Sequence, residues 1–537
     1  MFSMRSSVAA LCGAVSLLLA SSESVLALSS SGPQAYDKER AFVTGKVLSY
    51  AWLLSDGDVK GSEEGRELAL KIYGAKVGYR DYGYIGHGDV FSPSRNSNAW
   101  GANYDAVLSM GLRSKRDALG SVYGADFTLI VPAGSGGGSV VYGSPGVGSR
   151  VFADTVLGNF SMGYQEGVEA LMKVDVLGNM SGESGSAWGR YLRNFLRYAN
   201  GVPFHMYPGL YSENLFRSRG SSDRVSGFSA KFRDVLNSMP MRLSYVSEKM
   251  GGVTVGFSYS LSGYRDDTFR GGDFTVDQGV TSVKYVSSSQ ELVHEKKMLT
   301  VTRPRFDFGP VYKNILSGAI RYDIGSEDGA TLGVSLAGEY AKPKRRSDLV
   351  PGRDDGKKEE GVFIEYNNLE AVSAGIESGY RGLRFAVGGG YLGKSGRPKV
   401  YVTDKIRGKI PYVKDVPSYY LASSLSYTKG AFSASVTYFE SILAHNPPAV
   451  DFGHQVDFLK STFDGENVLR DIVVGFAYSL YKKGTTSLDT FLNCHMFFTR
   501  HSINVHNLVD GRVFERGKTY KNTHDGAIAV FGLKFGF

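Results

Sequence analysis

Residues 526–537 read GAIAVFGLKFGF, and this stretch decides the fold. An apolar residue stands at every second position of its second half: Phe531, Leu533, Phe535 and Phe537. Glycine or Lys534 occupies the positions between them. Successive side chains of a β-strand point to opposite faces, so the stretch predicts a strand with one apolar face and one small or polar face.

The same period of two recurs along the chain, at residues 253–261, 332–340, 432–438 and 472–480. Large apolar residues share one face of each stretch, and mostly glycine, serine, alanine or threonine form the other. A soluble β-sandwich alternates in the same way, so the period alone leaves both classes open. Tyr259, Tyr340 and Tyr438 sit on the apolar face near strand ends, which favours the aromatic girdle of a membrane barrel.

Connection lengths between the predicted strands alternate between short and long. The short connections are residues 248–252, 326–330, 380–383, 429–430 and 482–485. The long ones are residues 262–310, 342–361, 394–418, 441–467 and 501–525. Short turns on one side and long loops on the other are typical of outer-membrane barrels. We therefore predict an all-β fold, a closed antiparallel transmembrane β-barrel of about sixteen strands. About eighteen remain open, because residues 68–80 and 280–286 also look like strands.

Composition excludes several other classes. Aromatic residues make up 12% of the 537 residues, whereas disordered chains are poor in them. A mean hydropathy of −0.17 is too low for a helical membrane protein of this size. Residues 1–27 predict a cleaved signal peptide, with Arg5 before an apolar core and small residues at the cleavage site. The net charge of +8 is dispersed without a basic helix, so we expect no nucleic-acid partner.

Two stretches beside the longest insertion resemble the general trimeric porins of Gram-negative bacteria, most of all the alphaproteobacterial ones. Residues 152–165, FADTVLGNFSMGYQ, are similar to the porin strand that leads into the third loop. Residues 241–260, MRLSYVSEKMGGVTVGFSYS, are similar to the hairpin after that loop, and the terminal Phe537 also fits. The resemblance implies a barrel over residues 28–537, with residues 166–240 folded into the lumen as a constriction loop. It also implies a homotrimer.

Strand parity assigns charged residues to the lumen. If Leu243 and Tyr245 face lipid, Arg242 faces inward, and the same rule selects further basic residues: Lys46, Arg113, Arg321, Arg384 and Lys534. The insertion contributes acidic residues: Glu166, Glu169, Asp175 and Glu183. In the porin family, acids on the third loop face basic residues on the wall. The resemblance therefore implies that these residues line the pore or form its constriction, and Arg242 is the best placed of them. Alternatively, Arg242 is a solvated charge in the lumen with no special role.

Other patterns predict neither catalysis nor a cofactor. The glycine-rich residues 134–139 lack the following helix and lysine of a phosphate loop. His495, His501 and His506 have no second cluster at metal-ligand spacing. No Gly-x-Ser-x-Gly elbow is present, so we expect a protein that is not an enzyme and that holds no cofactor or metal.

The sequence thus predicts a porin in the outer membrane of a Gram-negative bacterium, surrounded by lipid and passing small hydrophilic solutes and ions by passive diffusion. Two alternatives stay open. The long loops, residues 54–99 and 262–310, favour a surface adhesin or antigen that binds host surface molecules. The long insertion would equally serve a selective transporter whose lumen is plugged.

Overall fold

The computed structural model describes residues 40–56, 60–61, 100–131, 146–182, 209–210, 241–261, 277–283, 294–300, 312–326, 329–343, 346–348, 362–395, 398–402, 407–409, 417–445, 462–507 and 519–537. Sixteen strands form one sheet: β1 (Arg40–Asp56), β3 (Trp100–Arg113), β4 (Val122–Val131), β5 (Gly146–Thr155), β6 (Gly158–Tyr164), β7 (Met241–Ser247), β8 (Val253–Ser260), β11 (Tyr312–Gly325), β12 (Thr331–Pro343), β15 (Leu369–Tyr380), β16 (Leu383–Gly393), β19 (Ser418–Lys429), β20 (Phe432–His445), β21 (Thr462–Lys483), β22 (Thr486–Asn507) and β23 (Thr519–Gly536). The two-residue β2 (Lys60–Gly61) adds to β23.

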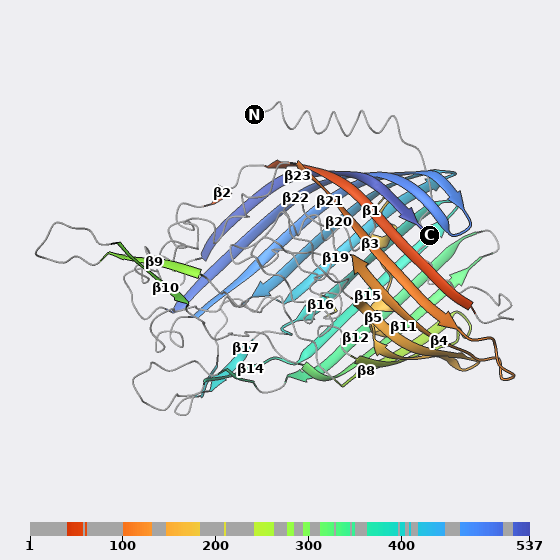
Figure 1. Cartoon of the computed structure of the whole chain (residues 1–537), viewed down its shortest axis with the longest axis horizontal. Helices are drawn as coiled ribbons and strands as arrows, with labels where there is room; N and C mark the ends of the chain where they lie inside the picture. The colour runs from red at the N-terminus through yellow and green to blue at the C-terminus, as the bar shows by residue number, and fades with distance from the viewer. Residues whose placement is uncertain are drawn as a thin grey trace, which may run out of the picture.

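The sheet closes on itself because β1 pairs with strands on both of its edges (Figure 1). Leu48 lies opposite Lys534 of β23 on one side and opposite Asp105 of β3 on the other. All strand pairs of the barrel are antiparallel, and closure leaves no sheet edge unpaired. The predicted closed antiparallel barrel is confirmed, with sixteen strands rather than eighteen.

Neither of the two regions that left eighteen strands possible adds a strand to the barrel within the described residues. Residues 280–286 overlap β9 (Asp277–Val283), which pairs with β10 (His294–Thr300) in a separate two-stranded sheet. Residues 68–80 lie outside the described residues, as does the predicted signal peptide, residues 1–27. A further small sheet contains β13 (Arg346–Asp348), β14 (Val362–Tyr366), β17 (Pro398–Val402) and β18 (Arg407–Lys409).

Side-chain exposure confirms the predicted parity of the strands. Phe257, Leu336 and Phe531 are 60%, 53% and 47% exposed and point outward. The residues between them, such as Ser258 and Ser335, are buried and point inward. Alternate positions of a strand face opposite sides of the sheet, so the barrel presents an apolar exterior and a small or polar interior. An apolar exterior of this kind suits a lipid environment.

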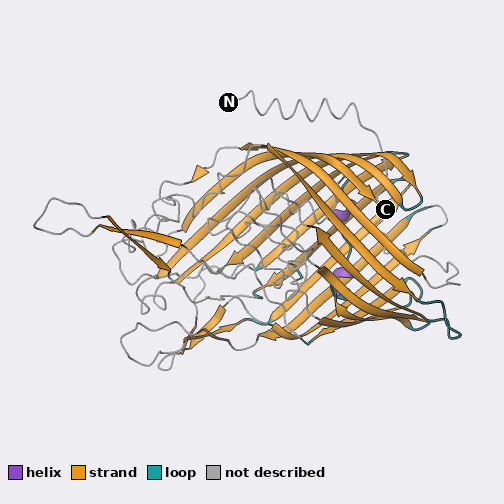
Figure 2. Cartoon of the chain, viewed as in Figure 1, coloured by secondary structure: helices purple, strands orange, loops and turns teal. Residues whose placement is uncertain are grey.

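The barrel wall differs in height around its circumference. β21 and β22 each contain 22 residues, whereas β6 and β7 each contain seven. At about 3.3 Å per residue, the long strands measure roughly 70 Å and the short ones roughly 23 Å. The long insertion leaves the wall between β6 and β7, where the strands are shortest. Inside the barrel it forms α3 (Val168–Leu171) and the 3-10 turn η1 (Leu177–Asn179), which Figure 2 shows within the ring of strands. No helix of the described residues is long and apolar enough to cross a membrane.

Candidate functional site: a strap inside the barrel

Residues 165–182, which we call the strap, run inside the lumen and lie against the inner face of the barrel wall. The strap starts at the end of β6 and makes hydrogen bonds in turn with β7, β8, β12, β19, β20, β22 and β23. It is mostly buried, and its irregular backbone uses these strands to satisfy donors and acceptors that a helix or sheet would satisfy internally. The strap therefore follows one side of the lumen and forms part of its lining.

The strap begins at a buried ion pair. Nη1 of Arg242 on β7 donates to Oε1 of Glu169 in α3 at 2.7 Å, and their side chains are 1% and 0% exposed. The carboxyl of Glu339 on β12 lies beside that of Glu169. A Cβ at Gly167 would collide with both the Arg242 guanidinium and the Glu169 carboxylate, so a larger residue there would have to displace the ion pair. Arg242 and Glu169, both predicted lumen residues, are thus brought together as an anchor.

The electrostatics of Glu169 favour its charged form. Burial raises the pKa of the carboxyl, but the Arg242 guanidinium and the hydrogen bond from Glu339 lower it by more. The net pKa of Glu169 lies below its ordinary value. A buried ion pair is costly to break from one side, because the remaining charge stays desolvated. The pair therefore fixes the start of the strap to β7.

Arg321 of β11 anchors the next part of the strap. Its Nε donates to Asp323 at 2.9 Å, and Nη2 pairs with Glu377 of β15. Nη1 lies 3.5 Å from the carbonyl oxygens of Met172 and Lys173 in the strap. The predicted inward direction of Arg321 is therefore correct, and its guanidinium connects two wall carboxylates with the strap backbone.

Serine hydroxyls of the wall hold the backbone of the strap. The Oγ atoms of Ser258 and Ser335 accept from the N–H groups of Val168 and Val174, at 3.0 and 2.7 Å. Ser424 Oγ donates to the carbonyl of Val176 at 2.9 Å. These serines point inward because each occupies the small, polar face of its strand. The face that alternation predicts as small and polar is therefore the docking surface of the strap.

The end of the strap is fixed at three strands, β20, β22 and β23. Ser435 Oγ of β20 accepts from the N–H of Ser181 at 2.7 Å, and Asn493 of β22 donates to the Ser181 carbonyl at 3.3 Å. Lys534 of β23 donates from Nζ to the Gly182 carbonyl at 3.2 Å. Lys534 faces the lumen, as the parity of the last strand predicts, and contacts the strap there.

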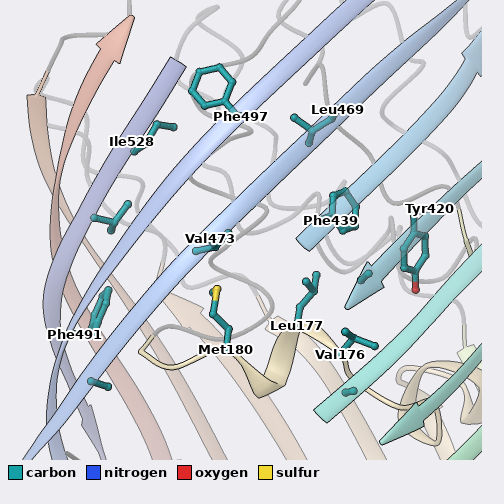
Figure 3. Packing of buried hydrophobic residues seen from close by; sticks show 14 of the residues in the cluster. Val176, Leu177, Met180, Tyr420, Phe439, Leu469, Val473, Phe491, Phe497 and Ile528 are labelled. Atoms are coloured by element: carbon teal, nitrogen blue, oxygen red, sulfur yellow. The ribbon is translucent and has the colours of Figure 1, made fainter. Parts of the chain in front are cut away.

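Apolar side chains fill the space between the strap and the barrel wall. Val176, Leu177 and Met180 belong to one buried cluster with Val473 and Phe491 of the wall. Figure 3 shows the three strap residues against the strands that carry these wall residues. The same cluster continues along neighbouring strands through Tyr420, Phe439, Leu469, Phe497 and Ile528 (Figure 3). Burying these groups stabilises the docked strap by about 25 cal/mol for each Å² of apolar surface removed from water.

Glycines of the wall make room for this close contact. A Cβ at Gly375 of β15 would lie 2.9 Å from Cβ of Val174. A Cβ at Gly475 of β21 would lie 2.7 Å from the Ser181 carbonyl oxygen. Both distances are shorter than van der Waals contact allows, so larger residues at these positions would displace the strap. We call the inward faces of β8, β12, β15, β19, β20 and β21, with their serines and glycines, the serine wall.

The inward faces of β3, β4 and β5, which we call the charged wall, differ from the serine wall. Arg150 pairs with Asp126 at 3.0 Å, and its guanidinium lies 5.6 Å from the ring centroid of Phe152. Arg113 lies over two rings, 5.0 Å from the centroid of Phe42 and 5.6 Å from that of Phe152. A cation over an aromatic face is attracted by the ring quadrupole. This wall therefore holds partly exposed guanidinium groups at fixed positions in the lumen.

The remaining predicted site residues occupy different environments. Asp175 of the strap is exposed, and Glu166 is half-buried. Lys46 lies half-buried on the inward face of β1, and Arg384 is exposed at the start of β16. Glu183 lies outside the described residues. These placements leave the constriction roles as predictions.

Sequence reasoning missed other buried polar groups inside the barrel. Nδ1 of His495 lies 2.8 Å from Oδ2 of Asp471, and both side chains are fully buried on adjacent strands. Glu339 is a second such group, buried at an inward position of β12. Strand parity is the available signal, because both acids occupy inward positions of their strands, Glu339 between Ala337 and Ala341 and Asp471 between Leu469 and Val473. Within the described ranges, no group of three or more His, Cys, Asp or Glu side chains has a geometry that could hold a metal ion.

The fold and the strap together define a class of protein: a closed β-barrel with an apolar exterior, whose lumen contains an inserted segment fixed to one side. No protein-family model matches the chain. The chain is 26% identical over 305 residues to an uncharacterised protein of Rickettsia felis, covering 55% of this chain and 62% of that protein. It is 26% identical over 306 residues to an uncharacterised protein of Rickettsia typhi, with the same coverage. The chain thus spans about three fifths of the length of the curated relatives it matches.

Solved structures with a similar fold include two porins. The anion-selective porin from Comamonas acidovorans has a TM-score of 0.35 and 11% identity, covering 93% of this chain and 100% of that chain. OmpF of Salmonella typhi, in a complex with daunomycin, has a TM-score of 0.43 and 10% identity, covering 93% and 98%.

Proposed function

We propose that the protein is an outer-membrane porin, a non-catalytic channel that passes small hydrophilic solutes and ions by passive diffusion. The strap carries this proposal, because its hydrogen bonds fix it along one side of the lumen. A barrel of about sixteen strands is too wide for its own side chains to fill, so water enters. A strap held against one wall narrows such a water-filled lumen and leaves a passage beside itself.

We assign the predicted site residues to two roles. Arg242 and Glu169 form the anchor of the strap, since each neutralises the other and both are buried. Asp175 on the strap is exposed and Arg113 on the charged wall is half-buried, and we place both at the passage. Charges on opposite sides of a narrow pore produce a transverse field that filters solutes by charge. Lys46 and Glu166 are further, half-buried candidates for this lining.

We also propose export to the outer membrane of a Gram-negative bacterium, after cleavage of residues 1–27, and assembly as a homotrimer. The outward face of the short strands supports the trimer. Phe160, Met162, Leu243 and Phe257 are exposed there and border a shallow hollow of about 1400 Å³. We place the contact between protomers at this hollow, because a neighbouring barrel could fill it with apolar side chains.

Single-channel recording in a planar bilayer tests the channel. Purified full-length protein is expected to show large, stepwise, ohmic conductance. Removing residues 170–180, the middle of the strap, is expected to increase the unit conductance, because the lumen loses its lining on one side. A folded, heat-modifiable barrel without conductance would contradict the proposal and favour a plugged transporter or an adhesin.

A second candidate function follows from the small sheets beyond the barrel. The β9–β10 hairpin and the sheet that contains β14 and β17 lie outside the ring of barrel strands (Figure 1). Ordered structure on long loops supports a surface that binds other molecules, including host surface molecules. Binding of the protein to host cells, lost after replacement of these loops but with conductance retained, would support this added role.

A further inference from the structure

Basic residues gather at the short-turn end of the barrel. Three consecutive hairpins, β15–β16, β19–β20 and β21–β22, place Arg381, Lys429, Lys482 and Lys483 at their turns, and all four side chains are exposed. The turn residues, 381–382, 430–431 and 484–485, contain no Asp or Glu. These hairpins are neighbours in the sheet, because β16 pairs with β19 and β20 pairs with β21. The positive charge is therefore continuous along this part of the rim.

The positive charge continues across the closure of the barrel. Arg40 starts β1 and is exposed, and the β3–β4 turn adds exposed Lys115 and Arg116. The one acid of this turn, Asp117, accepts hydrogen bonds from the N–H groups of Leu119 and Ser121 and from the Tyr123 hydroxyl. The hydrogen bond from Ser121 lowers the pKa of Asp117 and ties its carboxylate to its own turn. We call these turns and the start of β1 the basic arc.

The opposite side of the same rim carries no excess of positive charge. The β7–β8 turn carries Glu248 beside Lys249, and residues 327 and 328 of the β11–β12 turn are Glu and Asp in the sequence. A positive rim is therefore not a general property of the short turns. It belongs to the sector from β15 through β23 to β4.

Aromatic side chains place the basic arc relative to a bilayer. Tyr380, Tyr427 and Tyr481 lie at the short-turn ends of their strands, and they are 48%, 43% and 50% exposed. The guanidinium of Arg381 lies 5.1 Å from the ring centroid of Tyr380. Tyrosines at strand ends mark the boundary between hydrocarbon and headgroups. Cations immediately beyond this girdle lie at the level of lipid phosphates.

We propose that the basic arc binds anionic phospholipid headgroups of the leaflet around the short-turn end. The ligand class follows from the position of the charges, because phosphates of lipids meet the cations directly beyond the tyrosines. Several cations within about one Debye length of a surface, roughly 8 Å, act together on the same anionic lipids. The arc thus creates a lipid-selective sector on one side of the barrel and leaves the β7–β12 sector without such a preference.

Native mass spectrometry of the full-length protein tests the proposal, with phosphatidylglycerol competing against phosphatidylcholine. The triple variant Lys429→Gln, Lys482→Gln, Lys483→Gln is expected to lower the preference for phosphatidylglycerol about threefold or more. The matched controls are Lys249→Gln, on the opposite side of the rim, and Arg470→Gln, which removes an exposed cation paired with Glu440 far from these turns. Both controls are expected to keep the preference of the unmodified protein.

Two results would overturn the proposal. One is an unchanged lipid preference in the triple variant that still migrates as a folded, heat-modifiable barrel. The other is loss of binding to peptidoglycan sacculi with lipid preference intact, which would identify a cell-wall polymer as the partner. If the triple variant does not fold, Arg381→Gln with Lys115→Gln tests the same arc at two separate turns. Channel conductance is recorded in parallel, so failure of the lipid proposal is distinguishable from failure of the porin proposal.

Discussion

The two sides of the lumen, the serine wall and the charged wall, are made by the same strand alternation but present different inward residues. On the serine wall, Ser335, Ser435 and Gly475 are small, and the strap covers them. On the charged wall, Arg113 and Arg150 are large and partly exposed. Small inward residues leave space for a backbone to approach and hydroxyls to bond it, whereas charged residues require water or a counter-charge. The size of an inward residue therefore indicates whether protein or solvent covers that side.

Breaking the anchor at the start of the strap is expected to have the largest effect. Arg242→Met removes the guanidinium and leaves Glu169 buried beside Glu339 without a cation. Removing one partner of a buried ion pair costs about 3–5 kcal/mol. We expect the strap to detach from β7, which urea unfolding and an increase in open-channel noise would report.

The double variant Arg242→Met, Glu169→Leu is the control for this prediction. Replacing both partners by apolar residues removes the uncompensated charge, so much of the lost stability should return. If the single and double variants are equally destabilised, the ion pair is not what fixes the strap.

Filling the space beneath the strap is expected to have the next largest effect. Gly475→Ala places a Cβ 2.7 Å from the Ser181 carbonyl oxygen, so the strap must shift. Overpacking of this kind costs about 1–3 kcal/mol. Gly318→Ala is the matched control, because its nearest neighbour would lie at 3.8 Å. Comparable losses in the urea midpoint for both variants would show that glycine is needed for the strand and not for the strap.

The strand faces of the barrel are predictable from the sequence, whereas the contacts of the strap are not. Alternation at residues 332–340 and 526–537 depends on neighbouring positions, so strand faces, closure and the inward direction of Lys534 and Arg242 follow from it. The contact of Arg242 with Glu169 joins residues that are 73 positions apart and depends on the path of the insertion. Ser335 was recognisable only as part of a small polar face. Its role as acceptor for Val174 required the docked strap.

Removing one hydroxyl of the serine wall is expected to have a smaller effect. Ser435→Ala leaves the N–H of Ser181 without its acceptor, which costs about 1–2 kcal/mol for a buried donor. Faster hydrogen exchange of the Ser181 amide would report this loss directly. Ser109→Ala on β3 is the comparison, since Ser109 bonds Thr128 in a partly buried position away from the strap. Equal exchange of the Ser181 amide in Ser435→Ala and in the unmodified protein would contradict the assignment.

Changing the charged wall is expected to alter stability least and ion selectivity most. Arg113→Gln loses two cation–π contacts at a partly exposed site, which contribute about 0.5–1 kcal/mol each, so the urea midpoint should move little. The lumen loses a fixed positive charge, so the reversal potential in a salt gradient should shift in the direction of greater cation selectivity.

Arg113→Lys is the matched variant, because it keeps the charge while changing the stacking geometry. A shift shared by Arg113→Lys would assign selectivity to ring stacking, whereas a shift confined to Arg113→Gln assigns it to charge. Unchanged selectivity in both variants would remove Arg113 from the lining of the passage and leave the charged wall as a structural counterpart of the serine wall.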